Sequence, residues 1–228
     1  MFLDTGELTV ILETMKLGIF KGVTTNPTIL LKEEEERFIQ LTKIVENGAK
    51  KVFVQLVGDT FEELYHDFRE IQKLRIIQRV GIKVPINKIG IRIIREIKKD
   101  FPNQIVLGTA IYSADQGILS SLAGCDYIAP YVNRMSNNSI DPYASITKMR
   151  KFIDERNLKT EIMAASFKNS NQVIDSLIAG AHTATVSPDI VERMLNKELT
   201  EQAIKIFNED GKKIADLFEP KPTDGFKN

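Results

Sequence analysis

Eight short runs of β-forming residues, separated by longer segments with helical spacing, constrain the fold of this chain most strongly. The runs are MFLDT (1–5), KGVTTN (21–26), KVFVQLV (51–57), VGIKVPI (80–86), QIVLGTAIY (104–112), DYIAPYV (126–132), TEIMAAS (160–166) and TATVSP (183–188). Strands that alternate with helices indicate parallel βαβ units, and eight such units close a barrel. A chain of 228 residues has about the usual length for that fold. We therefore predict an α/β protein with a (β/α)8 TIM-barrel fold.

The segments between the runs carry apolar residues at helical spacing. The pattern is clearest over 61–74, over 89–101 and over 169–180, the last of which ends in Ala-Gly as a helix C-terminus does. These segments are expected to be helices that cover the barrel.

The domain organisation is expected to be simple, because no linker rich in Pro, Gly or Ser interrupts the alternation. We predict one barrel domain over residues 1–228. Apolar residues at Ile204, Phe207, Ile214 and Leu217 predict an additional C-terminal helix over about 200–218, which packs on its own barrel or contacts another subunit. Residues 219–228 are expected to form a disordered tail.

Composition excludes several classes of partner. With 43% hydrophobic and 27% charged residues the chain has a globular composition, and its 31 basic residues balance 31 acidic ones. No net field attracts nucleic acid or an anionic membrane, so we expect neither as a partner. The N-terminus lacks the basic and apolar regions of a signal peptide, and we expect a cytoplasmic protein. Cys125 is the only cysteine, which excludes an internal disulfide and a thiolate cluster, and it is expected to be a small buried filler.

The stretch VGIKVPINK, residues 80–88, places a lysine inside an apolar run. Alternation puts Val80, Ile82 and Val84 on one face and Lys83 and Pro85 on the other. Alone, this is a half-buried strand with a solvated lysine. In a barrel, however, one strand face meets helices and the other meets the packed interior, so Lys83 would point inward. Burial without a fixed carboxylate lowers the pKa of a lysine, as a Schiff-base nucleophile requires.

Polar residues also collect where the other strands are expected to end, which is where barrel active sites lie. They are Asp4, Thr24, Asn26, Gln55, Thr109, Tyr131, Arg134, Ser166, Lys168 and Ser187. Some have a simpler explanation when taken singly, since Asp4-Thr5 could cap a helix and Asn26-Pro27 could form a turn. Together they would surround one mouth of the barrel with hydrogen-bonding groups, which indicates a binding site.

Five sequence blocks resemble the transaldolase family, and they match its fructose-6-phosphate aldolase subgroup most closely. They are FLDT at the start, GVTTNPT at 22–28, KVP at 83–85, APYVNR at 129–134 and AASFK at 164–168. The resemblance runs from residue 2 to about residue 218 with matching order and spacing. GVTTNP and APYVNR are the specific blocks.

The resemblance implies a role for each of these positions. Lys83 would form the imine with a ketose C2 carbonyl, and Asp4 would assist proton transfer or hold the lysine in orientation. Thr24 and Asn26 would bind the hydroxyls of the dihydroxyacetone part, and Arg134, Ser166 and Lys168 the phosphate. Gln55, Thr109 and Tyr131 would hold a catalytic water. At Lys168 transaldolases commonly have arginine, so the contact with phosphate there would be a point charge. The family uses no metal or other cofactor, and neither His66 nor His182 has a ligand partner at useful spacing.

The activity implied is that of a class I aldolase, a lyase that forms or cleaves fructose 6-phosphate from dihydroxyacetone and glyceraldehyde 3-phosphate. Gln55, Ala129 and Tyr131 stand where transaldolases have glutamate, usually serine, and phenylalanine, which favours the aldolase. Three alternatives remain: a transaldolase of the pentose phosphate pathway, a sugar-phosphate isomerase, and a catalytically silent barrel that binds sugar phosphates. The resemblance further implies a ring-type homo-oligomer, a decamer.

Overall fold

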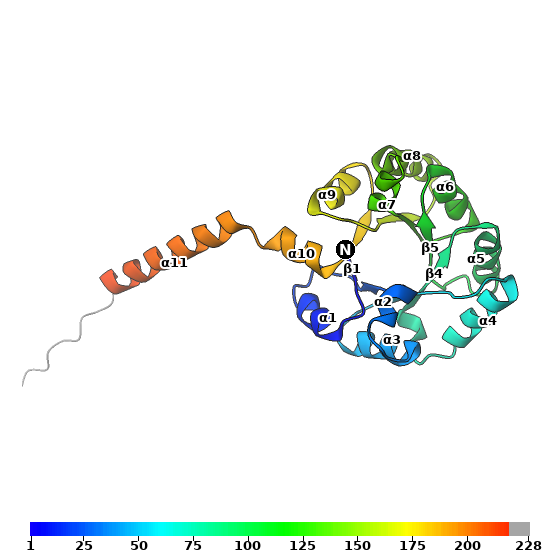
Figure 1. Ribbon diagram of the computed structural model, residues 1–228, viewed down its shortest axis with the longest axis horizontal. Coiled ribbons are helices and arrows are strands. Elements are labelled where there is room, and N and C mark those ends of the chain that lie inside the picture. Colours follow the sequence, from blue (N-terminus) through cyan, green and yellow to red (C-terminus); the bar gives the residue numbers. More distant parts are fainter. Residues whose placement is uncertain (219–228) are drawn as a thin grey trace, which may run out of the picture. The chain divides into compact units, whose positions relative to one another are not determined.

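A computed structural model describes residues 1–218 and divides the chain into two compact units, Met1–Val191 and a second that begins at Glu192. In the first unit eight parallel strands form a closed barrel in chain order (Figure 1). The strands are β1 (Phe2–Asp4), β2 (Val23–Thr24), β3 (Val52–Gln55), β4 (Val80–Pro85), β5 (Val106–Ile111), β6 (Tyr127–Pro130), β7 (Glu161–Ala164) and β8 (Thr183–Val186). The predicted (β/α)8 fold is confirmed.

Helices surround the strands on the outside of the barrel (Figure 1). They are α1 (Leu8–Met15), α2 (Pro27–Leu31), α3 (Arg37–Glu46), α4 (Phe61–Ile71), α5 (Lys88–Asp100), α6 (Ala114–Ala123), α7 (Val132–Asn137), α8 (Pro142–Glu155) and α9 (Ser170–Ile178). Helix α10 (Pro188–Leu195) begins in the first unit and ends in the second. The three helices expected from spacing are α4, α5 and α9. Thr60 and Glu63 form a capping box at the start of α4, and Asn87 and Asn169 cap α5 and α9 through their side chains.

The alternation along β4 directs Lys83 into the barrel. Strand β4 pairs with β3 and β5, with Lys83 in register with Gln55 on one side and Leu107 on the other. Leu107 belongs to the buried cluster of the barrel interior. That cluster consists of Phe2, Phe53, Leu107, Ala129, Met163 and Ala165. Lys83 is only 5% exposed, so the interpretation of a solvated lysine is wrong.

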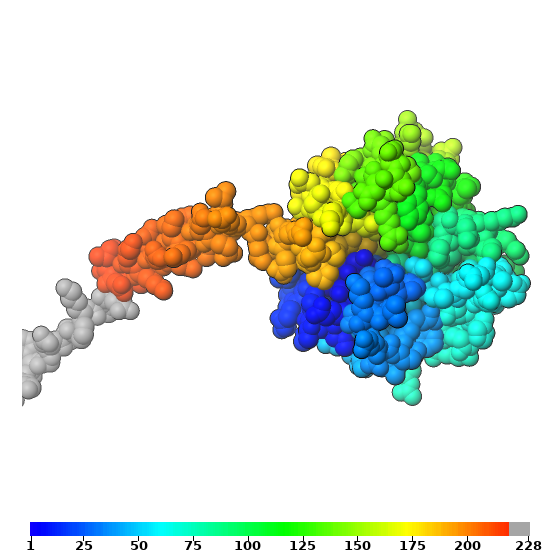
Figure 2. Space-filling view, viewed as in Figure 1, coloured from blue at the N-terminus to red at the C-terminus, as the bar shows by residue number. Residues whose placement is uncertain are grey.

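Three aromatic rings close the barrel below Lys83. Phe2, Phe53 and Tyr127 meet edge to face, with centroid separations of 5.5 Å, 5.7 Å and 6.1 Å. Gly81 makes room for them, because a Cβ atom at this position would lie 2.4 Å from the ring of Phe53. Side chains fill the ring of elements in the space-filling view (Figure 2). We refer to Phe2, Phe53 and Tyr127 as the aromatic floor.

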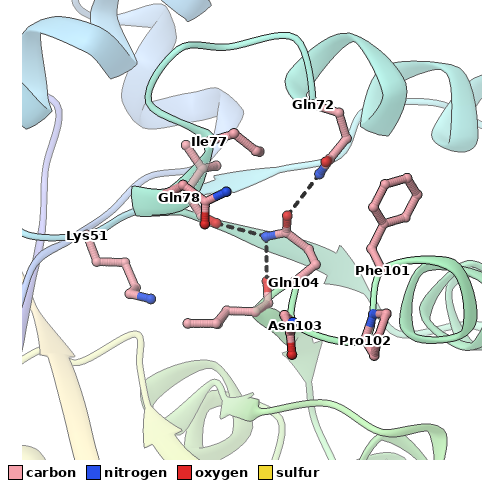
Figure 3. A pocket seen from close by; sticks show the side chains of 10 residues that line it. Lys51, Gln72, Ile77, Gln78, Phe101, Pro102, Asn103 and Gln104 are labelled. Atoms are coloured by element: carbon pink, nitrogen blue, oxygen red, sulfur yellow. Dashed lines mark hydrogen bonds between the residues drawn. The ribbon is translucent and has the colours of Figure 1, made fainter.

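A polar network lies at the amino-terminal ends of β4 and β5 (Figure 3), away from the carboxyl-terminal strand ends. The Gln104 amide donates to the carbonyl of Val80 at 2.8 Å and accepts from Gln72 at 2.9 Å. These residues, with Lys51 and Phe101, are among those that line a cavity of about 260 Å³. Barrel enzymes place their chemistry at the other end, so we interpret this network as structural.

Cys125 and His182 occupy structural positions as well. Cys125 is 3% exposed, and burial raises the pKa of its thiol to about 12, which suits the predicted filler. The Nδ1 atom of His182 accepts a hydrogen bond from the backbone N–H of Ile162 at 2.9 Å, between β8 and β7.

The second unit contains the predicted C-terminal helix. Helix α11 (Glu198–Phe218) begins two residues earlier than predicted and carries exposed apolar side chains. The predicted single domain over 1–228 stays a prediction, and the predicted tail at 219–228 lies outside the described residues. Among residues 1–218, no helix combines the length and apolar character needed to cross a bilayer.

Candidate active site

A small cavity lies inside the barrel at the carboxyl-terminal ends of the strands. Its volume is about 110 Å³. It is lined by Asp4, Thr24, Asn26, Lys83, Leu107, Thr109, Ala129, Tyr131, Arg134, Met163, Ala165, Ser166 and Thr185. Asp4, Asn26, Tyr131 and Arg134 also line a wider hollow of about 380 Å³, which places the two side by side. We refer to the smaller cavity as the inner cavity and to the wider one as the outer hollow.

Lys83 lies in the inner cavity. Its Nζ atom donates a hydrogen bond to the backbone carbonyl of Thr25 at 2.7 Å. Burial lowers the pKa of Lys83, although the negative charge of Asp4 opposes this effect. A neutral amine can keep the bond to the carbonyl and still offer its lone pair to an electrophile. The lysine is therefore held in place and is chemically suited to attack a carbonyl carbon.

Asp4, at the end of β1, is the carboxylate whose negative charge acts on Lys83. Its Oδ1 atom accepts a hydrogen bond from the hydroxyl of Thr24 at 2.6 Å, across the β1–β2 pair. Burial raises the pKa of Asp4, while the Lys83 charge and the Thr24 hydrogen bond oppose the rise. A carboxyl group so placed can take up and return a proton near the amine.

Tyr131 and Thr109 form a second polar pair in the inner cavity. The phenol of Tyr131 lies 2.9 Å from the hydroxyl of Thr109. Burial raises the pKa of Tyr131, so the phenol keeps its proton at neutral pH. Strand β5 has an irregular register between Gly108 and Ile111, where Ala110 has φ = 56° in the left-handed region. Strained backbone of this kind is concentrated at functional sites.

Arg134 and Ser166 lie near one another on the rim of the inner cavity. The guanidinium of Arg134, on α7, stacks 5.1 Å from the ring centroid of Tyr131 and donates to the hydroxyl of Tyr112 at 3.3 Å. Ser166 has φ = 62°. Its backbone carbonyl accepts a hydrogen bond at 2.7 Å from the N–H of Asn133, which is next to Arg134 on α7. This side of the site offers a permanent positive charge beside a hydroxyl, which suits an anionic group.

The remaining predicted site residues differ in how closely they approach this centre. Asn26 caps α2 by accepting from the N–H of Ile29 at 3.0 Å, and it lines both cavities. Gln55, at the end of β3, lines the outer hollow but not the inner cavity. Lys168 is exposed and lines neither, and its backbone N–H donates to Gln172 at 2.7 Å. Of the eleven residues predicted for the mouth of the barrel, Lys83 included, nine line these two cavities, and Lys168 and Ser187 line neither.

Two residues of this region escaped prediction from the sequence. Tyr112 supports Arg134, and its ring meets that of Tyr131 edge to face at 5.7 Å. Thr185, on β8, is 5% exposed and lines the inner cavity. The signal for Thr185 is present in the run TATVSP, where threonines alternate with Ala184 and Val186 and so share the inner face.

Comparison with known proteins agrees with this geometry. The family model described as transaldolase/fructose-6-phosphate aldolase matches residues 1–224. A relative described as a probable fructose-6-phosphate aldolase, from Streptococcus pneumoniae (strain ATCC 700669 / Spain 23F-1), is 36% identical over 211 residues. That match covers 91% of this chain and 94% of the relative. The chain therefore belongs to the transaldolase/fructose-6-phosphate aldolase family.

Proposed function

We propose that this protein is a class I aldolase that forms and cleaves fructose 6-phosphate, with dihydroxyacetone and glyceraldehyde 3-phosphate as the other reactants. The observation that carries the proposal is the placement of Lys83, which is 5% exposed, hydrogen-bonded to the Thr25 carbonyl and set in a cavity beside Asp4. This is the environment in which a lysine serves as a Schiff-base nucleophile.

Imine formation uses Lys83 and Asp4. The neutral amine of Lys83 attacks the C2 carbonyl of the ketose, and Asp4 in its ionised form takes the proton that the nitrogen loses. Asp4 then returns this proton to the C2 oxygen, which gives the carbinolamine hydroxyl. A second proton, taken up from solvent, converts that hydroxyl into the water that leaves as the protonated imine forms. The hydrogen bond from Thr24 stabilises the ionised form of Asp4 that begins this cycle.

Carbon–carbon cleavage follows from the imine. A base removes the proton of the C4 hydroxyl, the C3–C4 bond breaks, and glyceraldehyde 3-phosphate leaves. The bonding electrons move into the protonated imine, which gives the neutral enamine of dihydroxyacetone on Lys83. In our proposal a water held by Gln55, Thr109 and Tyr131 accepts the C4 proton.

Arg134 and Ser166 would bind the phosphate at the far end of the sugar, and Lys168, which is exposed outside both cavities, would add a positive charge at longer range. The short inner cavity and the wider outer hollow fit an extended chain whose ketone end is deepest. Holding both ends orients the C3–C4 bond relative to the catalytic groups.

Release of dihydroxyacetone distinguishes an aldolase from a transaldolase. An aldolase protonates C3 of the enamine and hydrolyses the imine, whereas a transaldolase keeps the enamine until a second aldehyde arrives. The raised pKa of Tyr131 keeps a proton donor in the inner cavity, and Gln55 carries no charge that would compete as a base. These two residues support the aldolase.

One experiment separates the main alternatives. The protein is incubated with fructose 6-phosphate, free dihydroxyacetone is assayed, and a parallel sample is reduced with borohydride and mapped by mass spectrometry. We expect free dihydroxyacetone and a reduced adduct on Lys83. An adduct without dihydroxyacetone, together with transfer of the three-carbon unit to erythrose 4-phosphate, would establish a transaldolase. Binding of the sugar without an adduct would establish a silent barrel, and conversion to an aldose without an adduct an isomerase.

We further propose that the protein assembles as a homo-oligomer of the ring type, a decamer, in which α11 contributes to subunit contacts. The support is the set of apolar side chains that α11 exposes, among them Phe207 at 70% and Leu217 at 76%. Side chains of this size are more often covered in a functional assembly.

A further inference from the structure

Thr185 is joined to the carboxylate of Asp4 through a second hydroxyl. The Oγ1 atoms of Thr185 and Thr24 lie 2.5 Å apart, and Thr24 in turn donates to Asp4 at 2.6 Å. All three residues line the inner cavity, from β8, β2 and β1. The two threonines are 5% and 1% exposed. A chain of two hydroxyls therefore ends on the carboxylate that faces Lys83.

The direction of this chain follows from counting protons. Each hydroxyl has one proton to donate. When Asp4 is ionised it can only accept hydrogen bonds. The hydroxyl proton of Thr24 is then used in the hydrogen bond to Asp4, so Thr185 must donate its own hydrogen bond to Thr24. A hydroxyl that accepts a hydrogen bond becomes a better donor, because the bonds polarise one another. Thr185 therefore strengthens the bond that Thr24 makes to ionised Asp4.

We propose that Thr185 is a positioning residue, which fixes the Thr24 hydroxyl as a donor to Asp4 and so keeps that carboxylate ionised and oriented for imine formation on Lys83. This inference rests on the proposed function, because it assigns Asp4 a proton to carry between amine and carbonyl oxygen. Strand β8 would then join β2 and β5 as a strand that contributes a threonine hydroxyl to the cavity around Lys83.

A packing role alone does not explain a hydroxyl at this position. A valine has nearly the same shape as a threonine, and burying a hydroxyl costs free energy unless it is hydrogen-bonded. The neighbouring core cluster is apolar, with side chains such as Leu107 and Met163. The partner that satisfies the Thr185 hydroxyl is the one that touches Asp4.

Other charged and titratable groups also lie around Asp4, and of these Lys83 acts on its pKa. They are Lys83 from β4, Tyr131 directly after β6, Arg134 from α7, and Glu7, Lys32, Glu33 and Asp189, which line a further hollow together with Asp4. A variant of Thr185 leaves all of them unchanged. A change in the titration of Asp4 is then attributable to the hydroxyl chain.

The test compares Thr185→Val, which removes only the hydroxyl, with Thr185→Ser, which keeps it. Thr183→Val is the matched control, because Thr183 is on the same strand and equally buried but does not line the inner cavity. For cleavage of fructose 6-phosphate we expect Thr185→Val to lower kcat about three- to tenfold, the range of one net hydrogen bond, with KM changed much less. The acidic limb of its kcat/KM profile should move to higher pH, since ionised Asp4 has lost support. Thr185→Ser should restore both values, and Thr183→Val should leave both unchanged.

A second readout keeps this inference separate from the proposed function. The carboxyl carbon of Asp4 is followed by NMR in protein labelled with ¹³C-aspartate, with Asp4→Asn used for assignment, and no turnover is needed. Thr185→Val should raise the pH at which Asp4 titrates. A wild-type midpoint in Thr185→Val, or an equal rise in Thr183→Val, overturns the role of Thr185 even if borohydride traps the imine on Lys83. Failure of wild-type protein to give that adduct overturns the proposed function instead.

Discussion

The phenol of Tyr131 and the hydroxyl of Thr109 lie 2.9 Å apart at the carboxyl-terminal ends of the neighbouring strands β6 and β5. Thr109 is fully buried, so this bond fixes the tyrosine oxygen at a defined height in the inner cavity. The pair gives the site a phenol as a third titratable group beside Asp4 and Lys83, and the charge of Asp4 helps to raise the pKa of that phenol.

Replacing Tyr131 by phenylalanine should therefore slow the release of dihydroxyacetone more than it slows imine formation. A loss of about a hundredfold in release is expected, as for removal of a general acid. Release is measured by a coupled assay, and imine formation by the rate of borohydride trapping. Thr109→Val, which leaves the phenol without its partner, should have a smaller effect of the same kind. Equal slowing of both steps would mean that Tyr131 acts before cleavage.

Adding Gln55→Glu to Tyr131→Phe should increase transfer to an acceptor aldose relative to release.

Lys83→Met should abolish cleavage of fructose 6-phosphate while the barrel remains folded. The methionine has a similar volume but no amine, so activity should fall on the order of a thousandfold or more. Circular dichroism and thermal melting check the fold. Lys51→Met, at a partly buried lysine by the opposite end of the barrel, is the control and should keep full activity. Substantial turnover by folded Lys83→Met would rule out the imine on this residue.

Arg134→Ala should raise KM for phosphorylated substrates while affecting unphosphorylated dihydroxyacetone little. The loss of a charge-assisted hydrogen bond corresponds to about 1.5–3 kcal/mol, or about 10- to 100-fold in KM. Steady-state kinetics with both kinds of substrate provide the measurement. Arg156→Ala is a matched control, because Arg156 also stacks on an aromatic ring, that of Phe152, but does not line the site. Equal effects on both substrates would assign Arg134 to support of Tyr131.

Removal of residues from Thr200 onward should leave species smaller than the full-length assembly, because it deletes most of α11 and its exposed apolar side chains. Sedimentation velocity gives the size distribution. A truncation that begins at residue 219 keeps α11 and should leave the assembly unchanged. If both truncations sediment like the full chain, α11 takes no part in subunit contacts.

Gly81→Ala should destabilise the fold, because the new Cβ would lie 2.4 Å from the buried ring of Phe53. Overpacking of this kind costs about 1–3 kcal/mol, which lowers Tm by several degrees in a protein of this size. Scanning calorimetry of the two proteins checks this. Gly211→Ala is the control: nothing lies within 4 Å of a Cβ atom at that helical position, so its Tm should not fall.

Much of the fold and site follows from local patterns in the sequence. The eight runs predict the strands because β-branched residues and period-two alternation survive in short segments, and the same alternation directs Lys83 inward once a barrel is assumed. The lengths of the strands are predicted less well than their positions, since the run over 21–26 contains only Val23–Thr24 as strand. Asn26 ends that strand early by capping α2.

Two outcomes at the site depend on barrel closure and on local backbone conformation: the contact of Thr185, which was not predicted, and the position of Lys168, which was predicted to bind substrate. Thr185 looks like an ordinary strand threonine until closure of the barrel brings β8 beside β1 and places its hydroxyl against Thr24. Lys168 follows Ser166 closely in sequence, yet Ser166 turns through a left-handed conformation and Lys168 emerges outside both cavities. Neither outcome is encoded in spacing alone.

The aromatic floor gives the inner cavity a single entrance. Phe2, Phe53 and Tyr127 seal the barrel beneath Lys83, so reactants, products and the water that hydrolyses the imine must all pass the mouth. In the proposed mechanism, a three-carbon fragment bound in that passage would shield its own bond to Lys83 from bulk solvent. The groups at the mouth would then set the lifetime of the enamine, because release of the fragment and its transfer to another aldehyde would both use this one entrance.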